Sequence, residues 1–144
     1  MHILIVEARF YEDISDELNA GAIAEIERRG ASYEIVVVPG ALEIPQAANL
    51  ALAHAAFDGV VALGCVIRGE TSHYDIVAHE SARAIMDLAL AREVPVGNGI
   101  LTVDSHEQAM ARAGVAGRNR GGAAAAACLD VAEIKAGLVA RANG

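Results

Sequence analysis

Segments rich in strand-forming residues alternate with segments of helical periodicity along this 144-residue chain. Runs of Ile, Val and Leu predict strands at residues 3–6, 33–38, 60–67 and 94–101. Apolar residues spaced three and four apart predict helices at residues 13–29, 43–56, 73–92, 105–113 and 122–142. The run 60–67 is almost wholly apolar, which is typical of a strand buried on both faces.

Local signals support these boundaries. The first helix carries an apolar face that we expect to be buried, and Gly30 marks its end. Ser72 followed by Asp75 approximates a capping box at the start of the helix at 73–92. The expected buried face of the first helix consists of Ile14, Leu18, Ala22 and Ile26.

The alternation predicts an α/β fold with a parallel sheet and helices on both faces. Four strands fit a flavodoxin-like three-layer αβα sandwich with the strand order 2-1-3-4, and we expect residues 1–144 to form one domain. Ligands of such sheets bind beyond the carboxyl ends of the strands. This rule selects four loops as the candidate site, at residues 8–13, 39–43, 66–73 and 102–105.

Composition excludes several classes of partner. A net charge of −8 argues against a nucleic-acid or anionic-membrane surface, and no apolar run reaches the ~18 residues of a membrane helix. Cys65 and Cys128 lie in apolar segments without metal-ligand spacing, so we expect buried free thiols and a cytoplasmic protein. The 54% of hydrophobic residues then predicts apolar surface buried between subunits of an oligomer.

The first two loops carry residues that suit a planar, polar ligand. Phe10 follows the first strand, where its ring is able to stack on a flat ligand or else to cover the core. Glu43 lies where the second loop becomes a helix, so its carboxylate either caps the helix or binds a ligand.

The third loop, residues 64–75, is the most informative. A buried strand runs into Gly69, a small polar pair and a helix start, whose free N–H groups form a ready anion site. Neither Walker spacing nor Gly-x-Gly-x-x-Gly is present, so a nucleotide phosphate is not indicated. His73 lies beside this anion site, either as a proton shuttle or as a plain surface residue at the helix start.

The fourth region adds Arg112. A lone Arg near a helix end is usually a surface charge, and it binds phosphate only if it folds toward the anion site. The chain has no Ser-His-Asp order, no Cys beside a His and no cluster with metal-ligand spacing, so we expect no metal site.

Taken together, these loops resemble the lumazine synthase family. The resemblance rests on collinear matches that cover nearly the whole chain, of which the segments Pro39–Pro45 (PGxxEIP) and Gly64–His73 (GxVIRGxTxH) are highly specific in combination. It implies condensation of 5-amino-6-(D-ribitylamino)uracil with 3,4-dihydroxy-2-butanone 4-phosphate to 6,7-dimethyl-8-ribityllumazine, in riboflavin biosynthesis and without a metal or organic cofactor. Further matches are Ala8–Phe10 and Gln108–Gly114.

The resemblance also implies roles for individual residues. Phe10 would stack on the pyrimidine, the segment Ala41, Leu42 and Glu43 would hold the ribityl chain, and the backbone at Val66 and Ile67 would read the uracil edge. Gly69, Glu70 and Thr71 would offer amides to the phosphate, and Arg112 would reach it from a neighbouring subunit. His73 would move protons in Schiff-base formation, phosphate elimination and ring closure.

Three departures from the family pattern stand out. Asn98 occupies the position of a common phenylalanine that covers the ligand from the adjacent subunit, and Glu70 replaces a small residue. In residues 114–121 a family lysine is replaced by Ala116, while Arg120 keeps a positive charge. Asn98 and Glu70 leave open a non-catalytic flavin- or lumazine-binding protein, and an archaeal-type riboflavin synthase, which resembles this family, is a second alternative that the Arg68–His73 segment disfavours.

The family forms pentamers, some of which assemble further. The resemblance therefore implies a homo-oligomer whose sites lie between adjacent subunits, with small-molecule substrates and no nucleic-acid or membrane partner. Because the first predicted strand begins at residue 3, without the N-terminal extension that some members add to a neighbour's sheet, we expect the bare pentamer.

Overall fold

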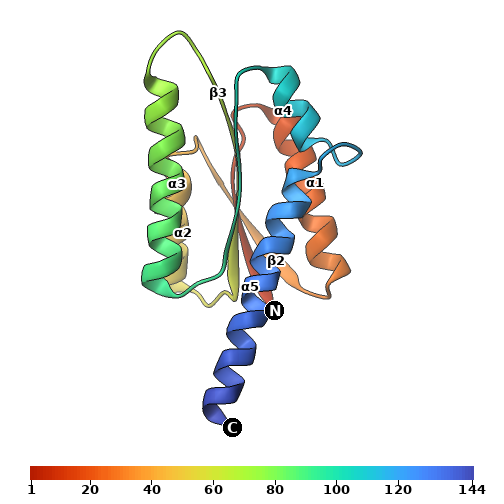
Figure 1. Cartoon of the computed structure of the whole chain (residues 1–144), viewed down its shortest axis with the longest axis vertical. Helices are drawn as coiled ribbons and strands as arrows, with labels where there is room; N and C mark the ends of the chain where they lie inside the picture. Colours follow the sequence, from red (N-terminus) through yellow and green to blue (C-terminus); the bar gives the residue numbers. More distant parts are fainter.

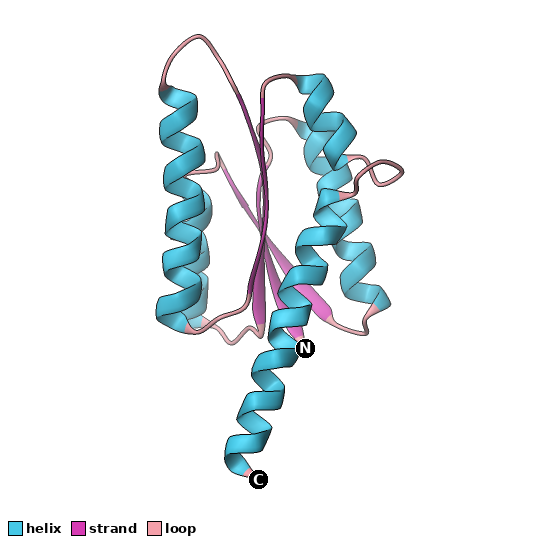
Figure 2. Cartoon of the chain, in the orientation of Figure 1, coloured by secondary structure: helices cyan, strands magenta, loops and turns pink.

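A computed structural model describes all 144 residues and has a four-stranded, wholly parallel sheet. The sheet order is β2-β1-β3-β4, as the sequence predicts. Helices cover both faces, with α2 and α3 on one side and α1, α4 and α5 on the other (Figures 1 and 2). The elements are β1 (His2–Ala8), α1 (Glu12–Arg28), β2 (Ser32–Val38), α2 (Glu43–His54), β3 (Gly59–Ile67), α3 (His73–Arg92), β4 (Val96–Val103), α4 (His106–Ala113) and α5 (Arg120–Asn143).

Two apolar cores lie on the two faces of the sheet because successive strand residues point to opposite sides. In β1, Ile3 and Ile5 pack with α1, α4 and α5, whereas Leu4 and Val6 pack with α2 and α3. The first six residues of β3 are buried, which confirms the prediction of a strand covered on both faces.

The helices on the α1 side pack closely. Ile14, Leu18, Ala22 and Ile26 are fully buried, as their spacing predicts, and Gly30 ends the turn after α1 with a φ of 75°. α5 lies against β4, where a Cβ on Gly97 would stand 1.8 Å from the carbonyl oxygen of Ala124. Only glycine therefore permits this approach of helix to strand.

The structure corrects the predictions for β4 and for the start of α3. The fourth strand begins and ends two residues later than expected, because residues 102 and 103 still pair with Val66 and Ile67 of β3. The capping box at α3 is absent: Ser72 has helical backbone angles and makes no side-chain cap. The carboxylate of Asp75 faces Arg68 instead of reaching back to the helix start, with 3.8 Å between Oδ1 of Asp75 and Nη1 of Arg68.

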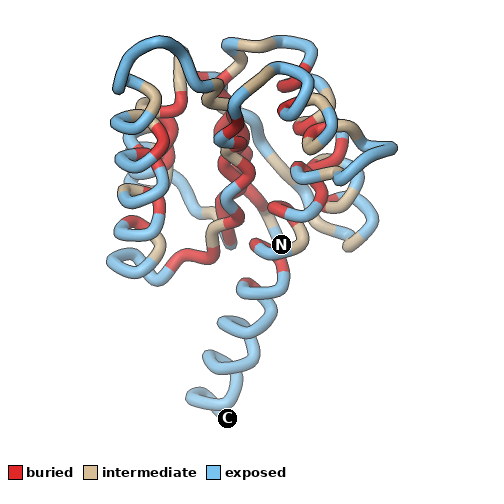
Figure 3. The backbone as a smooth tube through the Cα atoms, turned by 45° about the horizontal axis from the view of Figure 1, so that its top comes forward, coloured by how far each residue is buried: buried red, intermediate tan, exposed pale blue.

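The second half of α5 extends beyond the body of the molecule (Figure 3). Its residues from 133 onward are exposed, and the helix carries an apolar stripe of Val131, Ile134, Leu138 and Val139. No helix is both long enough and apolar enough to span a bilayer. Cys128 is a buried free thiol, whereas Cys65, also free, is only half-buried, contrary to expectation.

Candidate active site

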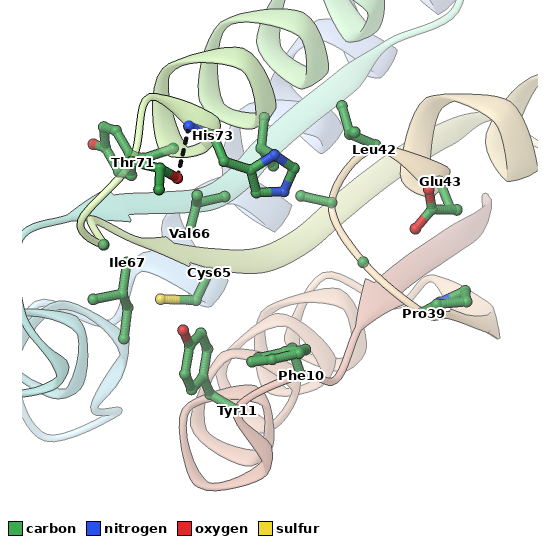
Figure 4. A pocket seen from close by; sticks show the side chains of 15 residues that line it. Phe10, Tyr11, Pro39, Leu42, Glu43, Cys65, Val66, Ile67, Thr71 and His73 are labelled. Carbon is green, nitrogen blue, oxygen red and sulfur yellow. Dashed lines mark hydrogen bonds between the residues drawn. The ribbon is translucent and has the colours of Figure 1, made fainter.

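A cavity of about 490 Å³ opens at the carboxyl end of the sheet, where the loops after β1, β2 and β3 meet. Figure 4 shows side chains of the β1–α1 loop on the wall opposite the first residue of α3. The cavity is therefore the place that the strand-end rule selects. It is lined by Phe10, Tyr11, Pro39, Gly40, Ala41, Leu42, Glu43, Cys65, Val66, Ile67, Gly69, Thr71, His73, Tyr74 and Val77.

Most of the predicted site residues come together here. The lining includes Phe10, Ala41, Leu42, Glu43, Val66, Ile67, Gly69, Thr71 and His73. Glu70 lies in the same loop as Gly69 and Thr71 but is not part of the lining, so its side chain does not shape the cavity.

An aromatic pair forms the wall contributed by the β1–α1 loop. The ring of Phe10 is 75% exposed and meets Tyr11 edge to face, with 4.9 Å between ring centroids. The loop is held by Ser15, whose hydroxyl donates to the carbonyl of Ala8 and whose N–H donates to the carbonyl of Tyr11. An aromatic face that is left free at the cavity suits stacking on a planar ligand.

A tight turn forms the wall contributed by the β2–α2 loop. The N–H of Glu43 donates to the carbonyl of Gly40, and the N–H of Ile44 donates to that of Ala41. A Cβ on Gly40 would lie 3.1 Å from Oε1 of Glu43, so the glycine leaves room for the carboxylate. The fully buried Ile44 anchors the turn, and Glu43 remains at the cavity in the first turn of α2.

The β3–α3 loop offers unused hydrogen-bond donors. Residues Gly69–Ser72 are exposed, and their backbone N–H groups donate to no acceptor in the protein. The N–H of His73 contacts Oγ1 of Thr71 at 3.3 Å, and the helix start behind it adds the positive end of the α3 dipole. The combination is suited to an anion.

His73 extends from the first turn of α3 into the cavity (Figure 4). Its imidazole forms no hydrogen bond or ion pair with another residue, so both ring nitrogens are available to a ligand. The other histidines lie elsewhere: His2 pairs with Glu34 and His106 with Asp13.

Arg112 and Asn98 lie outside this cavity. Both line a separate hollow of about 370 Å³ between β4, α4 and α5. The guanidinium of Arg112 donates to the carbonyl of Gln108 in its own helix, and Oδ1 of Asn98 accepts from the N–H of Ile100. Within one chain, the fold does not bring Arg112 to His73.

Sequence reasoning missed several lining residues, among them Cys65, Tyr11 and Tyr74. Burial raises the pKa of Cys65 to about 11 and also raises the pKa of Tyr11, so both side chains are neutral donors at neutral pH. No group of three or more His, Cys, Asp or Glu side chains converges to hold a metal ion. The cavity therefore offers stacking, a carboxylate, anion-binding amides and an imidazole.

Comparison with known proteins gives one consistent result. The family model described as 6,7-dimethyl-8-ribityllumazine synthase matches residues 1–136. A protein of that name from Methylobacterium radiotolerans is 63% identical over 92% of this chain and 81% of the relative. One from Agrobacterium fabrum is 54% identical over 93% of this chain and 94% of the relative. A third, 6,7-dimethyl-8-ribityllumazine synthase 1 from Rhodopseudomonas palustris, is 55% identical over 92% of this chain and 85% of the relative.

Proposed function

Because this chain belongs to the 6,7-dimethyl-8-ribityllumazine synthase family and is an enzyme of riboflavin biosynthesis, we propose that its cavity joins the two family substrates. These are 5-amino-6-(D-ribitylamino)uracil and 3,4-dihydroxy-2-butanone 4-phosphate. The observation that carries the proposal is that one cavity holds Phe10, Glu43 and His73 together with the unpaired amides of the β3–α3 loop.

The pyrimidine substrate occupies the part of the cavity between the first two loops. Its ring stacks on Phe10, and its uracil edge meets the backbone at Val66 and Ile67. Ala41, Leu42 and Glu43 hold the ribityl chain, whose hydroxyls donate to the carboxylate of Glu43. The exposed ring of Phe10 and the position of Glu43 at the cavity support this arrangement.

The butanone phosphate binds with its phosphate at the start of α3. The amides of Gly69, Glu70 and Thr71 donate to the phosphate oxygens. The positive end of the α3 dipole further stabilises the negative charge of the phosphate. Arg112 of a neighbouring subunit completes the site, since this arginine lies away from the cavity of its own chain.

His73 moves protons during the condensation. The amine of the pyrimidine attacks the ketone and water leaves to form a Schiff base; phosphate is then eliminated, and ring closure releases a second water. An imidazole that forms no hydrogen bond or ion pair with another residue is able to accept and return protons at each of these steps. Holding both reactants in one cavity supplies a further share of the rate enhancement.

The assembly proposed is a homo-oligomer, a bare pentamer whose sites lie between adjacent subunits. Two apolar surfaces support it: the stripe on α5 and an exposed set on α3, with a groove of about 720 Å³ between the ends of these helices. Surfaces of this kind are usually covered by another chain. The exposed set on α3 is Ile76, Met86 and Leu90. Light scattering that gave only a monomer would refute this assembly.

The proposed location is the cytoplasm. Neither Cys65 nor Cys128 is part of a disulfide, and free thiols are typical of a reducing compartment.

Incubation of the purified protein with both substrates tests the proposed reaction. We expect fluorescent lumazine and inorganic phosphate to appear in equal amounts. Turnover of 6,7-dimethyl-8-ribityllumazine alone would instead indicate a riboflavin synthase. Tight binding of riboflavin or lumazine without any turnover would indicate a binding protein.

A further inference from the structure

Arg68 connects the β3–α3 loop to the corner between β4 and α4. Its Nε donates to Oδ1 of Asp104 at 2.9 Å, and its backbone N–H donates to the carbonyl of Val103. The guanidinium also lies over the ring of Tyr74, with 4.3 Å from Cζ to the ring centroid. Three elements, the end of β3, the start of α3 and the β4–α4 corner, therefore meet at one side chain.

The loop that follows Arg68 has little else to hold it. Residues Gly69–Ser72 are exposed, and a Cβ added to Gly69 would meet no atom within 4 Å. Ser72 makes no side-chain cap. The ion pair of Arg68 with Asp104 is the only one that joins this loop to the β4–α4 corner.

The backbone on the acceptor side of the link is held by hydrogen bonds. The N–H of Asp104 donates to Oε1 of Gln108 at 2.8 Å, and Oγ of Ser105 accepts from the N–H of Gln108 at 3.1 Å. Asp104 is thus tied to the first turn of α4. The guanidinium has the carboxylate of Asp104, whose backbone is held in this way, on one side and the ring of Tyr74 on the other, an arrangement suited to its planar shape.

We propose that Arg68 is a positioning residue that sets the spacing of the free amides of Gly69–Thr71, and thereby the affinity of the site for a phosphate group. The inference rests on the proposed function, in which these amides bind the butanone phosphate. Arg68 lies outside the lining of the cavity, so it acts through the loop. Small displacements of the groups that hold a substrate lower the reaction rate steeply. The exposed ion pair between Arg68 and Asp104 should therefore affect substrate binding more than it affects the stability of the fold.

A simpler alternative is that Arg68 attracts phosphate by its charge alone. The two explanations predict opposite effects for Asp104→Asn. Removal of this negative charge strengthens phosphate binding if only charge matters. It weakens phosphate binding if the link to Arg68 positions the loop, because an amide is a poorer partner for guanidinium than a carboxylate.

The test compares Asp104→Asn, Arg68→Met and the double variant in the full-length protein. Arg28→Met, which removes an exposed ion pair with Glu25 on α1, is the matched control. Two quantities are measured: the Kd of inorganic phosphate by calorimetry, and the KM of each substrate. Melting temperatures identify any variant that fails to fold.

We expect Asp104→Asn to raise the phosphate Kd and the KM of the butanone phosphate about threefold or more, and Arg68→Met to raise them about tenfold. The KM of the pyrimidine should change less than about twofold, and the double variant should be no weaker than Arg68→Met, since both changes break one link. The control should match wild type.

Unchanged or tighter phosphate binding in Asp104→Asn would overturn the proposal, as would equal losses for both substrates. Calorimetry measures phosphate binding without any turnover, so it tests the positioning role of Arg68 even if the protein does not catalyse the proposed reaction. A wild-type protein that binds phosphate but forms no lumazine would refute the function and leave the positioning role in force.

Discussion

The guanidinium of Arg9 donates a 3.1 Å hydrogen bond from Nη1 to the carboxylate of Glu7, which is only 3% exposed at the end of β1. Arg9 also pairs with Asp16 on α1, and these contacts raise the pKa of Arg9. The second oxygen of Glu7 has no partner in the protein. The charge of this buried carboxylate is thus compensated by a single residue, directly before the loop that carries Phe10.

Arg9→Met should lower the free energy of unfolding by about 2–4 kcal/mol, because it leaves Glu7 buried without its partner. Glu7→Gln in the same chain should restore much of this loss, since the amide carries no charge. Urea denaturation of the single and double variants measures both effects. If the double variant is as unstable as Arg9→Met alone, the loss arises from something other than the unpaired carboxylate.

His73→Ala should lower kcat about 10- to 10³-fold, which is within or somewhat below the usual contribution of a general acid–base residue. Activity should persist, because both substrates are still held together. His79→Ala, which changes an exposed histidine later in α3, is the control and should retain the wild-type rate. If both variants have the same steady-state rate, His73 does not carry out the proposed proton transfers.

Cys65 should react slowly with thiol reagents at neutral pH. Burial raises its pKa to about 11, so only about one thiol in 10⁴ is ionised at pH 7. The rate should rise about tenfold per pH unit toward pH 11 and fall when the pyrimidine occupies the cavity. Cys128→Ala leaves Cys65 as the only thiol for this measurement. Fast labelling at pH 7 that the pyrimidine does not slow would contradict both the burial and the location of the site.

Gly97→Ala should destabilise the fold by about 3 kcal/mol or more, because its Cβ would collide with the backbone of Ala124. Gly137→Ala, in the free half of α5, is the matched change, since nothing lies within 4 Å of its added Cβ. That substitution should stabilise by up to about 1 kcal/mol through helix propensity. Thermal unfolding distinguishes the two, and equal melting temperatures would mean that α5 does not approach β4 this closely.

The sequence predicts the elements and the helix faces because these depend on local periodicity, whereas the strand order follows from the flavodoxin-like fold that four strands alternating with helices fit. Ile14 and Leu18 are buried as their spacing requires. The predicted end of β4 lies two residues too early because Gly97 and Gly99 interrupt the apolar run, whereas the true end is set by pairing with Val66 and Ile67, more than thirty residues away.

The candidate site was predictable where motifs occur in loops, as for Phe10 and His73. Sequence reasoning misses Cys65 as a lining residue because it belongs to an apolar strand. Which side chains of that strand reach the cavity becomes visible only once the strands are paired in the sheet. The link between Arg68 and Asp104 spans 36 positions, a separation that no local pattern detects. Arg112 lies apart from the cavity of its own chain, so its proposed role requires an assembly of several chains.

The most direct test of the central claim is a crystal structure of the protein with 5-amino-6-(D-ribitylamino)uracil bound and the second substrate omitted, so that no turnover occurs. We predict electron density for the pyrimidine ring stacked on Phe10, with the ribityl chain at Glu43 and the start of α3 left open beside His73. Density for the substrate in any other cavity, with this one empty, would contradict the assignment of the site.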